Sequence, residues 1–111
     1  MLDTCSIIIR KPLGNEQATL GIRAAFAMQT NAGLPVKVVL MGDGLYSVLS
    51  SQGYVKELFG RFMGEDGEVY AILEDMAERG LSEDQMPDGI MYIAASEVSE
   101  LVLETDSVMT F

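Results

Sequence analysis

Two short stretches hold residues that suit the binding of an anion. Gly42, Asp43 and Gly44 directly follow an apolar run, and a glycine-rich turn at such a place leaves backbone N–H groups open to a negative ligand. Arg10 and Lys11 form a basic loop in an acidic chain. If both stretches end strands of one parallel sheet, they meet at the edge where α/β proteins bind ligands. The sequence therefore predicts an anion site here; the alternative is that both cations pair with surface carboxylates.

Asp43 has two possible roles in that turn. Leu45, Val48 and Leu49 follow at helical spacing, so Asp43 is predicted to cap a helix rather than to act as a catalytic acid. Its charge would also oppose an anion bound directly against it. Tyr46, one turn into this helix, either lines the ligand crevice or packs in the core.

Cys5 is the only thiol of a chain that has no histidine. A lone cysteine excludes an intrachain disulfide and, without histidine, a structural zinc site built from one chain. A reactive thiolate needs a nearby cation or a helix N-terminus, whereas the neighbouring Asp3 is acidic. We therefore expect Cys5 to be inert and buried, with catalysis through it as the alternative. Glu65, Asp66 and Glu68 lack the spacing of a calcium loop, so no cofactor is expected.

The composition is that of a globular domain with a strong acidic excess. Apolar residues make up 49% and charged residues 22% of 111 residues, which suits one domain with one core. The formal net charge of −10 disfavours direct contact with nucleic acid or an anionic membrane, because both attract basic surfaces. No apolar run reaches the roughly 18 residues that span a bilayer. The start of the chain lacks the basic residues of a signal peptide, so a cytoplasmic protein is expected.

Strands and helices are predicted to alternate along the chain. Short β-branched or apolar runs predict strands at residues 5–9, 36–41, 69–72, 90–94 and 107–111. Apolar residues at helical spacing predict helices at about 15–31, 45–49, 55–63, 73–78 and 96–102. Arg79 and Gly80 are expected to close the fourth helix, and Ser96 to cap the last one. This alternation predicts a single three-layer α/β/α domain over residues 1–111, with a mostly parallel five-stranded sheet.

One amphipathic segment has two possible partners. Its apolar stripe consists of Val55, Leu58, Phe59, Phe62 and Met63. Four other predicted helices already serve the sheet of a small domain. The stripe is therefore either ordinary core or the patch that contacts another subunit.

Four segments resemble motifs of one protein family, and they occur along the chain in the same order as in that family. Gly42–Tyr46 reads GDGLY and is similar to the GDGVY-type signature of the DsrE/DsrF sulfur-relay family. Arg10–Gly14, before a helix, resembles the RRAPYG-type loop of the TusC/DsrF branch. Residues 69–72, leading to Arg79-Gly80, resemble that family's third strand and its helix ending in an RG dipeptide, and residues 106–111 resemble its A-D-x-V-L-x-F ending. The resemblance covers nearly the whole chain.

The resemblance implies a small α/β subunit that assembles into trimers or hexamers. Some relatives carry sulfur as a cysteine persulfide and pass it between proteins. Their cysteine lies at the end of the third strand, and the matching position here is Ile72, which has no reactive atom. The ligand-binding residues expected from the turn, the loop and this position are Arg10, Lys11, Gly14, Gly42, Asp43, Gly44, Tyr46 and Ile72.

Three functions follow from these residues, in order of preference. The first is a non-catalytic subunit or binding protein linked to sulfur relay, acting as a homo-oligomer or beside related, cysteine-bearing subunits. The second is a sulfurtransferase that carries a persulfide on Cys5. The third is a small-anion or nucleotide binder using the GDG turn, which lacks both common phosphate-binding glycine patterns.

Overall fold

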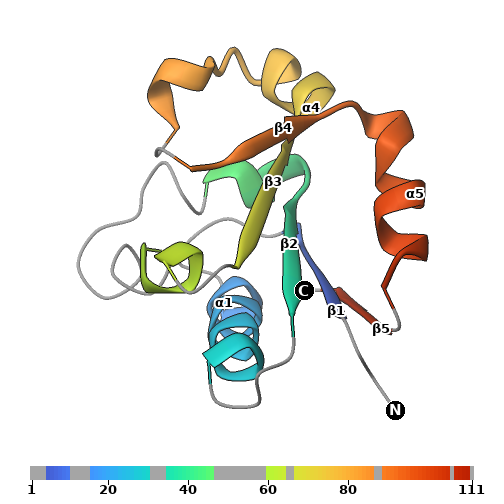
Figure 1. Ribbon diagram of the computed structural model, residues 1–111. Coiled ribbons are helices and arrows are strands. Elements are labelled where there is room, and N and C mark those ends of the chain that lie inside the picture. The colour runs from blue at the N-terminus through green and yellow to red at the C-terminus, as the bar shows by residue number, and fades with distance from the viewer. Residues whose placement is uncertain are drawn as a thin grey trace.

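Five parallel strands form one sheet in the computed structural model, which describes residues 5–10, 16–30, 35–46, 60–64, 67–86, 89–105 and 107–110. The strands are β1 (Cys5–Ile9), β2 (Val36–Leu40), β3 (Glu68–Ile72), β4 (Met91–Ile93) and β5 (Ser107–Thr110). Their order across the sheet is β4-β3-β2-β1-β5 (Figure 1). All five lie where the sequence predicts strands, with ends that differ by a residue or so.

Helices lie on both faces of this sheet. The helices are α1 (Glu16–Thr30), α4 (Leu73–Glu78) and α5 (Val98–Leu103), with the 3-10 turns η1 (Gly42–Leu45), η2 (Glu83–Gln85) and η3 (Ala95–Glu97). Residues 60–64 are also helical. In Figure 1, α1 and the 60–64 segment lie on the left of the strands, and α5 lies on the right. The predicted α/β/α layering is therefore confirmed. No helix within the described residues is long and apolar enough to cross a membrane.

The face of the sheet toward α1, here the α1-side face, holds the main core. Alternate strand residues point to opposite faces, and the α1-side set is almost fully buried. Ile22 and Ala25 of α1 pack onto it, together with Leu45 of η1 and Phe62. The strand residues in this cluster are Cys5, Ile7, Ile9, Val36, Val38, Leu40, Val69 and Ala71.

The opposite face, here the α5-side face, is covered more thinly. Of the described residues, Val39, Tyr70 and Ile72 form its buried cluster. Val98 and Leu101 of α5 pack against that cluster while remaining partly exposed. The partly buried strand and turn residues around it are Ile8, Met41 and Ile93. Two successive isoleucines of β1, Ile7 and Ile8, thus belong to different clusters.

Two predicted helix caps are wrong and one helix end is confirmed. Met41 precedes η1, and Asp43 lies inside that turn without capping it. Ser96 lies inside η3, so Glu97 occupies the position before α5. Arg79 ends α4 and Gly80 follows with φ +65°, the left-handed geometry expected of a glycine there. The two errors share a cause: a 3-10 turn precedes each helical segment and shifts its start.

The described part of the Val55–Met63 stripe belongs to the core. Phe62 is 3% exposed and joins the α1-side cluster, and Met63 packs partly against it. Gly67 follows so closely that a Cβ there would lie 2.6 Å from the Phe62 ring. Val55, Leu58 and Phe59 lie outside the described residues. Core packing, one of the two alternatives, therefore accounts for Phe62.

Candidate functional site

The carboxyl ends of the strands gather loops and turns at one edge of the sheet. β2 runs through Met41 into η1, β3 runs directly into α4, and β4 runs into η3. Because all pairings are parallel, these connections lie beside one another at the upper edge in Figure 1. This is the edge at which the sequence places a ligand site.

The GDG turn is pressed onto the end of β1. The Met41 N–H donates to the Ile9 carbonyl at 3.0 Å, and the Gly44 N–H donates to the Met41 carbonyl at 2.8 Å. A Cβ on Gly44 would lie 1.9 Å from the Ile9 carbonyl oxygen and 3.2 Å from the Arg10 nitrogen. The close approach therefore requires glycine at residue 44, and it brings the turn beside Arg10 as predicted.

Gly42 is required for a different reason. Its φ of +53° lies in the left-handed region, where a side chain is strained. Its N–H donates to the Asp75 carboxylate at 2.9 Å. The chain's own carboxylate therefore occupies a donor that the sequence assigns to a bound anion.

A second carboxylate acts in the same way one strand further along the sheet. The Ala95 N–H lies 3.0 Å from both oxygens of Glu74. Glu74 and Asp75 are neighbours in the first turn of α4, and α4 follows β3, which lies between β2 and β4. The start of α4 thus holds the turns on both sides through their backbone N–H groups.

Arg79 is a cation that contacts the GDG turn directly. Its Nε and Nη2 donate to the Asp43 carboxylate at 3.2 and 3.1 Å, and its Nη1 donates to the Asp75 carbonyl at 3.1 Å. A Cβ on Gly42 would lie 3.5 Å from Arg79 Nη2. Since Asp43 is well exposed, the ion pair contributes about 1 kcal/mol or less to the stability of the fold. Its main effect is to hold the Arg79 guanidinium beside the GDG turn.

The sequence assigns Arg79 only to the end of a helix and misses this contact. Asp43 and Arg79 are 36 residues apart. One signal was available: a cation that ends the helix after β3 must lie near the turn after β2, because the two strands are neighbours. Asp75, in the first turn of the same helix, could have been found by the same reasoning.

The other predicted site residues differ in how far they are exposed to solvent. Arg10 is exposed at the end of β1, and Tyr46 is half-buried at the end of η1. Ile72 ends β3 at 1% exposure, and it packs on the α5-side face rather than facing solvent. Lys11 and Gly14 lie outside the described residues.

Cys5 lies at the opposite end of the sheet from this edge. It begins β1, pairs in register with Val36 at the start of β2, and is 1% exposed. Its Sγ lies 3.7 Å from the Ser6 carbonyl. The expected burial of Cys5 is confirmed. Across the described ranges, no group of three or more cysteine and acidic side chains is arranged to hold a metal ion.

One tyrosine on the α5-side face has a strongly raised pKa. Burial, followed by the nearby Glu68 carboxylate and its hydrogen bond, raises the pKa of Tyr70 to about 12. Glu104 adds to the shift and pairs with Lys37 at 3.2 Å. Tyr70 is therefore neutral at physiological pH and acts as a hydrogen-bond donor.

The fold and its carboxyl-edge turn define a single-domain parallel α/β protein in which β2 leads directly into a GDG 3-10 turn. The sequence pattern of the DsrE/DsrF-like family matches residues 4–111, so the chain belongs to that family. The expectation drawn from the GDGLY segment and its companions is confirmed.

Solved structures share the fold, among them the following two. The crystal structure of the ychN protein from E. coli matches with a TM-score of 0.84 and 22% identity, covering 98% of this chain and 99% of that one. The protein of unknown function MTH1491 from Methanobacterium thermoautotrophicum matches with a TM-score of 0.77 and 12% identity, covering 98% and 100%. No curated protein matches the chain.

Proposed function

We propose that the chain is a non-catalytic subunit or binding protein linked to sulfur relay. Family membership supports the connection to sulfur relay. The observation that carries the non-catalytic reading is the position of the only thiol. Cys5 is buried at the amino end of β1, whereas Arg10, the GDG turn and Ile72 lie at the carboxyl edge.

The chemistry of a persulfide carrier explains why this position matters. An accessible thiolate must attack the sulfur of a donor persulfide, and the sulfur must then be accessible to an acceptor thiolate. Cys5 is 1% exposed and sits in the α1-side core, where an apolar setting favours the neutral thiol. Ile72, at the position matched to the family's cysteine, has no atom that can carry sulfur.

Sulfur transfer tests this proposal directly. The chain is mixed with a cysteine desulfurase loaded with radioactive sulfur, and the label retained after desalting is counted. We expect no more label than on Cys5→Ser, and slow alkylation of native Cys5 that becomes fast after denaturation. Label on Cys5 that passes to a second protein would contradict the proposal and favour the sulfurtransferase alternative.

A matched variant moves the thiol to the other end of the sheet. Cys5→Ser combined with Ile72→Cys keeps one cysteine but places it at the end of β3. Label on this variant alone would mean that the carboxyl edge still accepts a persulfide donor and that only the thiol is absent.

A second candidate, anion binding at the carboxyl edge, is favoured by the cations around the GDG turn. Gly42 lies beside the Arg79 guanidinium, and Arg10 is exposed at the end of the neighbouring strand. Asp75 occupies the Gly42 N–H, so the proposed ligand contacts side-chain cations more than this donor. Its predicted ligand set also includes Lys11, Gly14 and Gly44.

Thermal unfolding in phosphate tests the anion site. A ligand that binds only the folded chain raises the melting temperature, and Arg10→Ala with Lys11→Ala should reduce the gain. Arg61→Ala is the control, because Arg61 lies over the Phe26 ring. Asp43→Asn should increase the gain by removing a competing carboxylate beside Arg79. An unchanged melting temperature in every variant would contradict the site.

We also propose that the protein assembles, as a trimer or hexamer of itself or with related sulfur-relay subunits, in the cytoplasm. Light scattering should give a mass well above 12.1 kDa. Phe59→Glu tests the apolar stripe, since Phe62 is buried in the core and its replacement would unfold the chain. A monomer at micromolar concentration would contradict self-assembly.

A further inference from the structure

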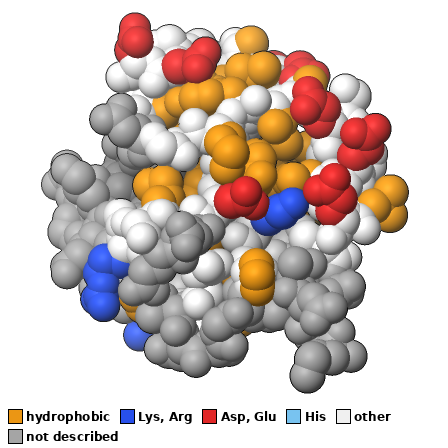
Figure 2. Space-filling model, in the orientation of Figure 1, with side chains coloured by type: hydrophobic (Ala, Val, Ile, Leu, Met, Phe, Trp, Pro, Cys, Tyr) orange, Lys and Arg blue, Asp and Glu red, His pale blue; other side chains and the backbone are white. Residues whose placement is uncertain are grey.

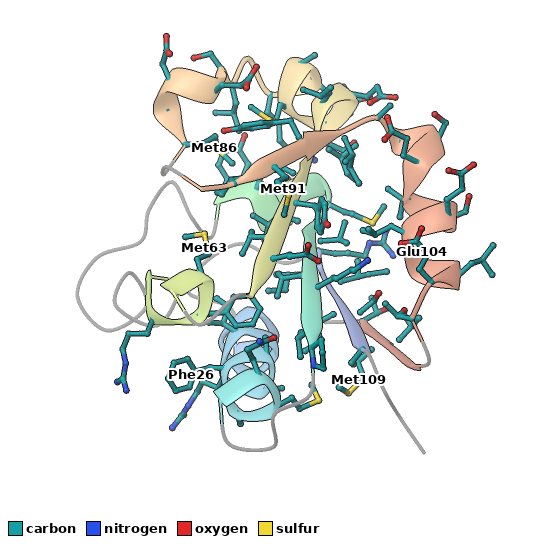
Figure 3. All side chains as sticks on the ribbon, in the orientation of Figure 1. Phe26, Met63, Met86, Met91, Glu104 and Met109 are labelled. Atoms are coloured by element: carbon teal, nitrogen blue, oxygen red, sulfur yellow. The ribbon has the colours of Figure 1, made fainter. Side chains whose placement is uncertain are left out.

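The α5-side face leaves an apolar area uncovered beside α5. Met91 and Ile93 of β4 pair in register with Tyr70 and Ile72 of β3, so all four side chains point to the same face. Met91 is 38% exposed, and Ile93 is partly exposed. Met41 and Leu101 border the same area. Figure 2 shows apolar side chains gathered over these elements, and Figure 3 shows Met91 in front of β3 and β4.

Acidic side chains surround this area on the α5 side. Glu97 just before α5, Glu100 within it and Glu104 just after it recur three and four residues apart, which places them on one side of this helical segment. Glu104 contacts Lys37 of β2, so these carboxylates lie next to the sheet, beside the side of α5 on which Val98 and Leu101 pack. Glu68 of β3 adds a further carboxylate beside Tyr70. The acidic-rimmed face, as we call it, consists of Met41, Met91, Ile93 and Leu101 with Glu68, Glu97, Glu100 and Glu104.

The negative charge of this rim favours a positively charged binding partner. Lys37 is the cation seen beside the rim, and it is already paired with Glu104. A second copy docked by the same face would bring its own acidic rim against this one, so the self-assembly proposed above would use another surface. An anionic membrane or a nucleic acid would be repelled in the same way. A basic partner gains both apolar burial and charge complementarity.

We propose that the acidic-rimmed face docks a segment of a partner protein that combines apolar side chains with Lys or Arg. Apolar side chains of the segment cover Met91 and Ile93, and its cations pair with the carboxylates of α5. This inference rests on the sheet face alone. It stands or falls independently of the anion site and of sulfur transfer.

A synthetic peptide serves as the probe. It is about 18 residues long, or five helical turns, with Leu at every third or fourth position and Lys elsewhere. Its binding to the full chain is followed by fluorescence anisotropy, and the contact is mapped by NMR on ¹⁵N-labelled protein. We expect shifts centred on Met91, Ile93 and Leu101, and binding at least tenfold weaker at about 0.3 M salt, because salt screens exposed charges.

Matched variants separate the rim from the rest of the surface. Glu100→Lys with Glu104→Lys should weaken binding at least tenfold. Glu83→Lys with Asp84→Lys makes the same change in charge on η2, which lies away from α5 in Figure 1, and should weaken it less than threefold. Met91→Ser should weaken binding, whereas Leu103→Ser, at an 83% exposed position of α5, should not.

Three outcomes would overturn the proposal. The first is no binding of the Lys/Leu peptide at low salt and millimolar concentration. The second is equal weakening by the rim and control variants, which would mean unspecific attraction to an acidic protein. The third is self-association that strengthens with salt and is lost in Met91→Ser while the peptide does not bind, which would make a second copy the occupant.

Discussion

The two faces of the sheet receive alternate residues of the same short strands, yet they are packed to different degrees. On the α1-side face, β1, β2 and β3 contribute fully buried side chains, and α1, η1 and Phe62 cover them. On the α5-side face, six-residue α5 covers a small cluster and leaves Met91 exposed. One face therefore holds most of the buried core, and the other leaves apolar surface exposed.

The largest expected loss of stability comes from replacing one of two neighbouring isoleucines of β1. Ile7 is 0% exposed on the α1-side face, and Ile8 is partly exposed on the α5-side face. Ile7→Ala should lower the free energy of unfolding by about 3 kcal/mol, and Ile8→Ala by about 1 kcal/mol, because the cost grows with the cavity left behind. Urea denaturation measures both. Equal losses would mean that the two faces are packed alike.

The next effect concerns the turn that brings η1 onto the α1-side face. Gly44→Ala places a methyl group against the Ile9 carbonyl and should displace Leu45 from the core, at a cost of about 2–3 kcal/mol. Gly80→Ala, at φ +65° with open space around it, should cost about 1 kcal/mol. Thermal unfolding of both variants checks the ranking, and a milder Gly44→Ala would argue against the close approach.

Tyr70, on the α5-side face, should make the stability of the fold depend on pH in the alkaline range. The pKa of Tyr70 rises from 10.0 to about 12 on folding, so the unfolded chain loses its proton first. The stabilisation is fully present below pH 10 and is lost as the pH rises toward 12. The unfolding free energy of the native sequence should therefore fall more steeply than that of Tyr70→Phe.

Two measurements check this titration. Urea denaturation at several pH values gives the slope for both proteins, and parallel slopes would contradict the shift. Absorbance of the tyrosinate ion, as the difference between native sequence and Tyr70→Phe, reports the pKa of Tyr70 itself. Glu68→Gln should lower that pKa, because the Glu68 carboxylate contributes to the shift.

The smallest expected losses of stability come from replacing leucines on the two sides of α5. Leu101 packs against the α5-side cluster, whereas Leu103 is 83% exposed. Leu101→Ser should cost about 1–2 kcal/mol, and Leu103→Ser should stay within about 0.5 kcal/mol of the native sequence. Denaturant titration of both variants measures these losses. A large loss of unfolding free energy in Leu103→Ser would mean that α5 packs on the sheet by another side.

The strands were predictable because their signals are local. Ile7-Ile8-Ile9, the run from Val36 and the short run before α4 are apolar and β-branched, and such runs favour buried parallel strands. The caps were less predictable. Asp43 and Ser96 follow local capping rules, but 3-10 turns shift the helix starts in both places.

The candidate site was predictable in position but not in its contacts. The rule that ligands bind at the carboxyl edge placed Arg10 and the GDG turn together, and the close approach of Gly44 to Ile9 and Arg10 agrees with it. The partners of the turn come from α4: Asp75 binds the Gly42 N–H, and Arg79 binds Asp43. They are more than 30 residues away, so no local pattern identifies them.

The sequence by itself determined the alternation of strands and helices, the family and the single thiol, because each depends on residue type and spacing along the chain. Only the tertiary structure decided that α4 fills the backbone donors of the neighbouring turns, and that α5 covers one face of the sheet incompletely. The physical reason is the strand order: placing β3 between β2 and β4 brings the start of α4 between two turns that are far apart in sequence.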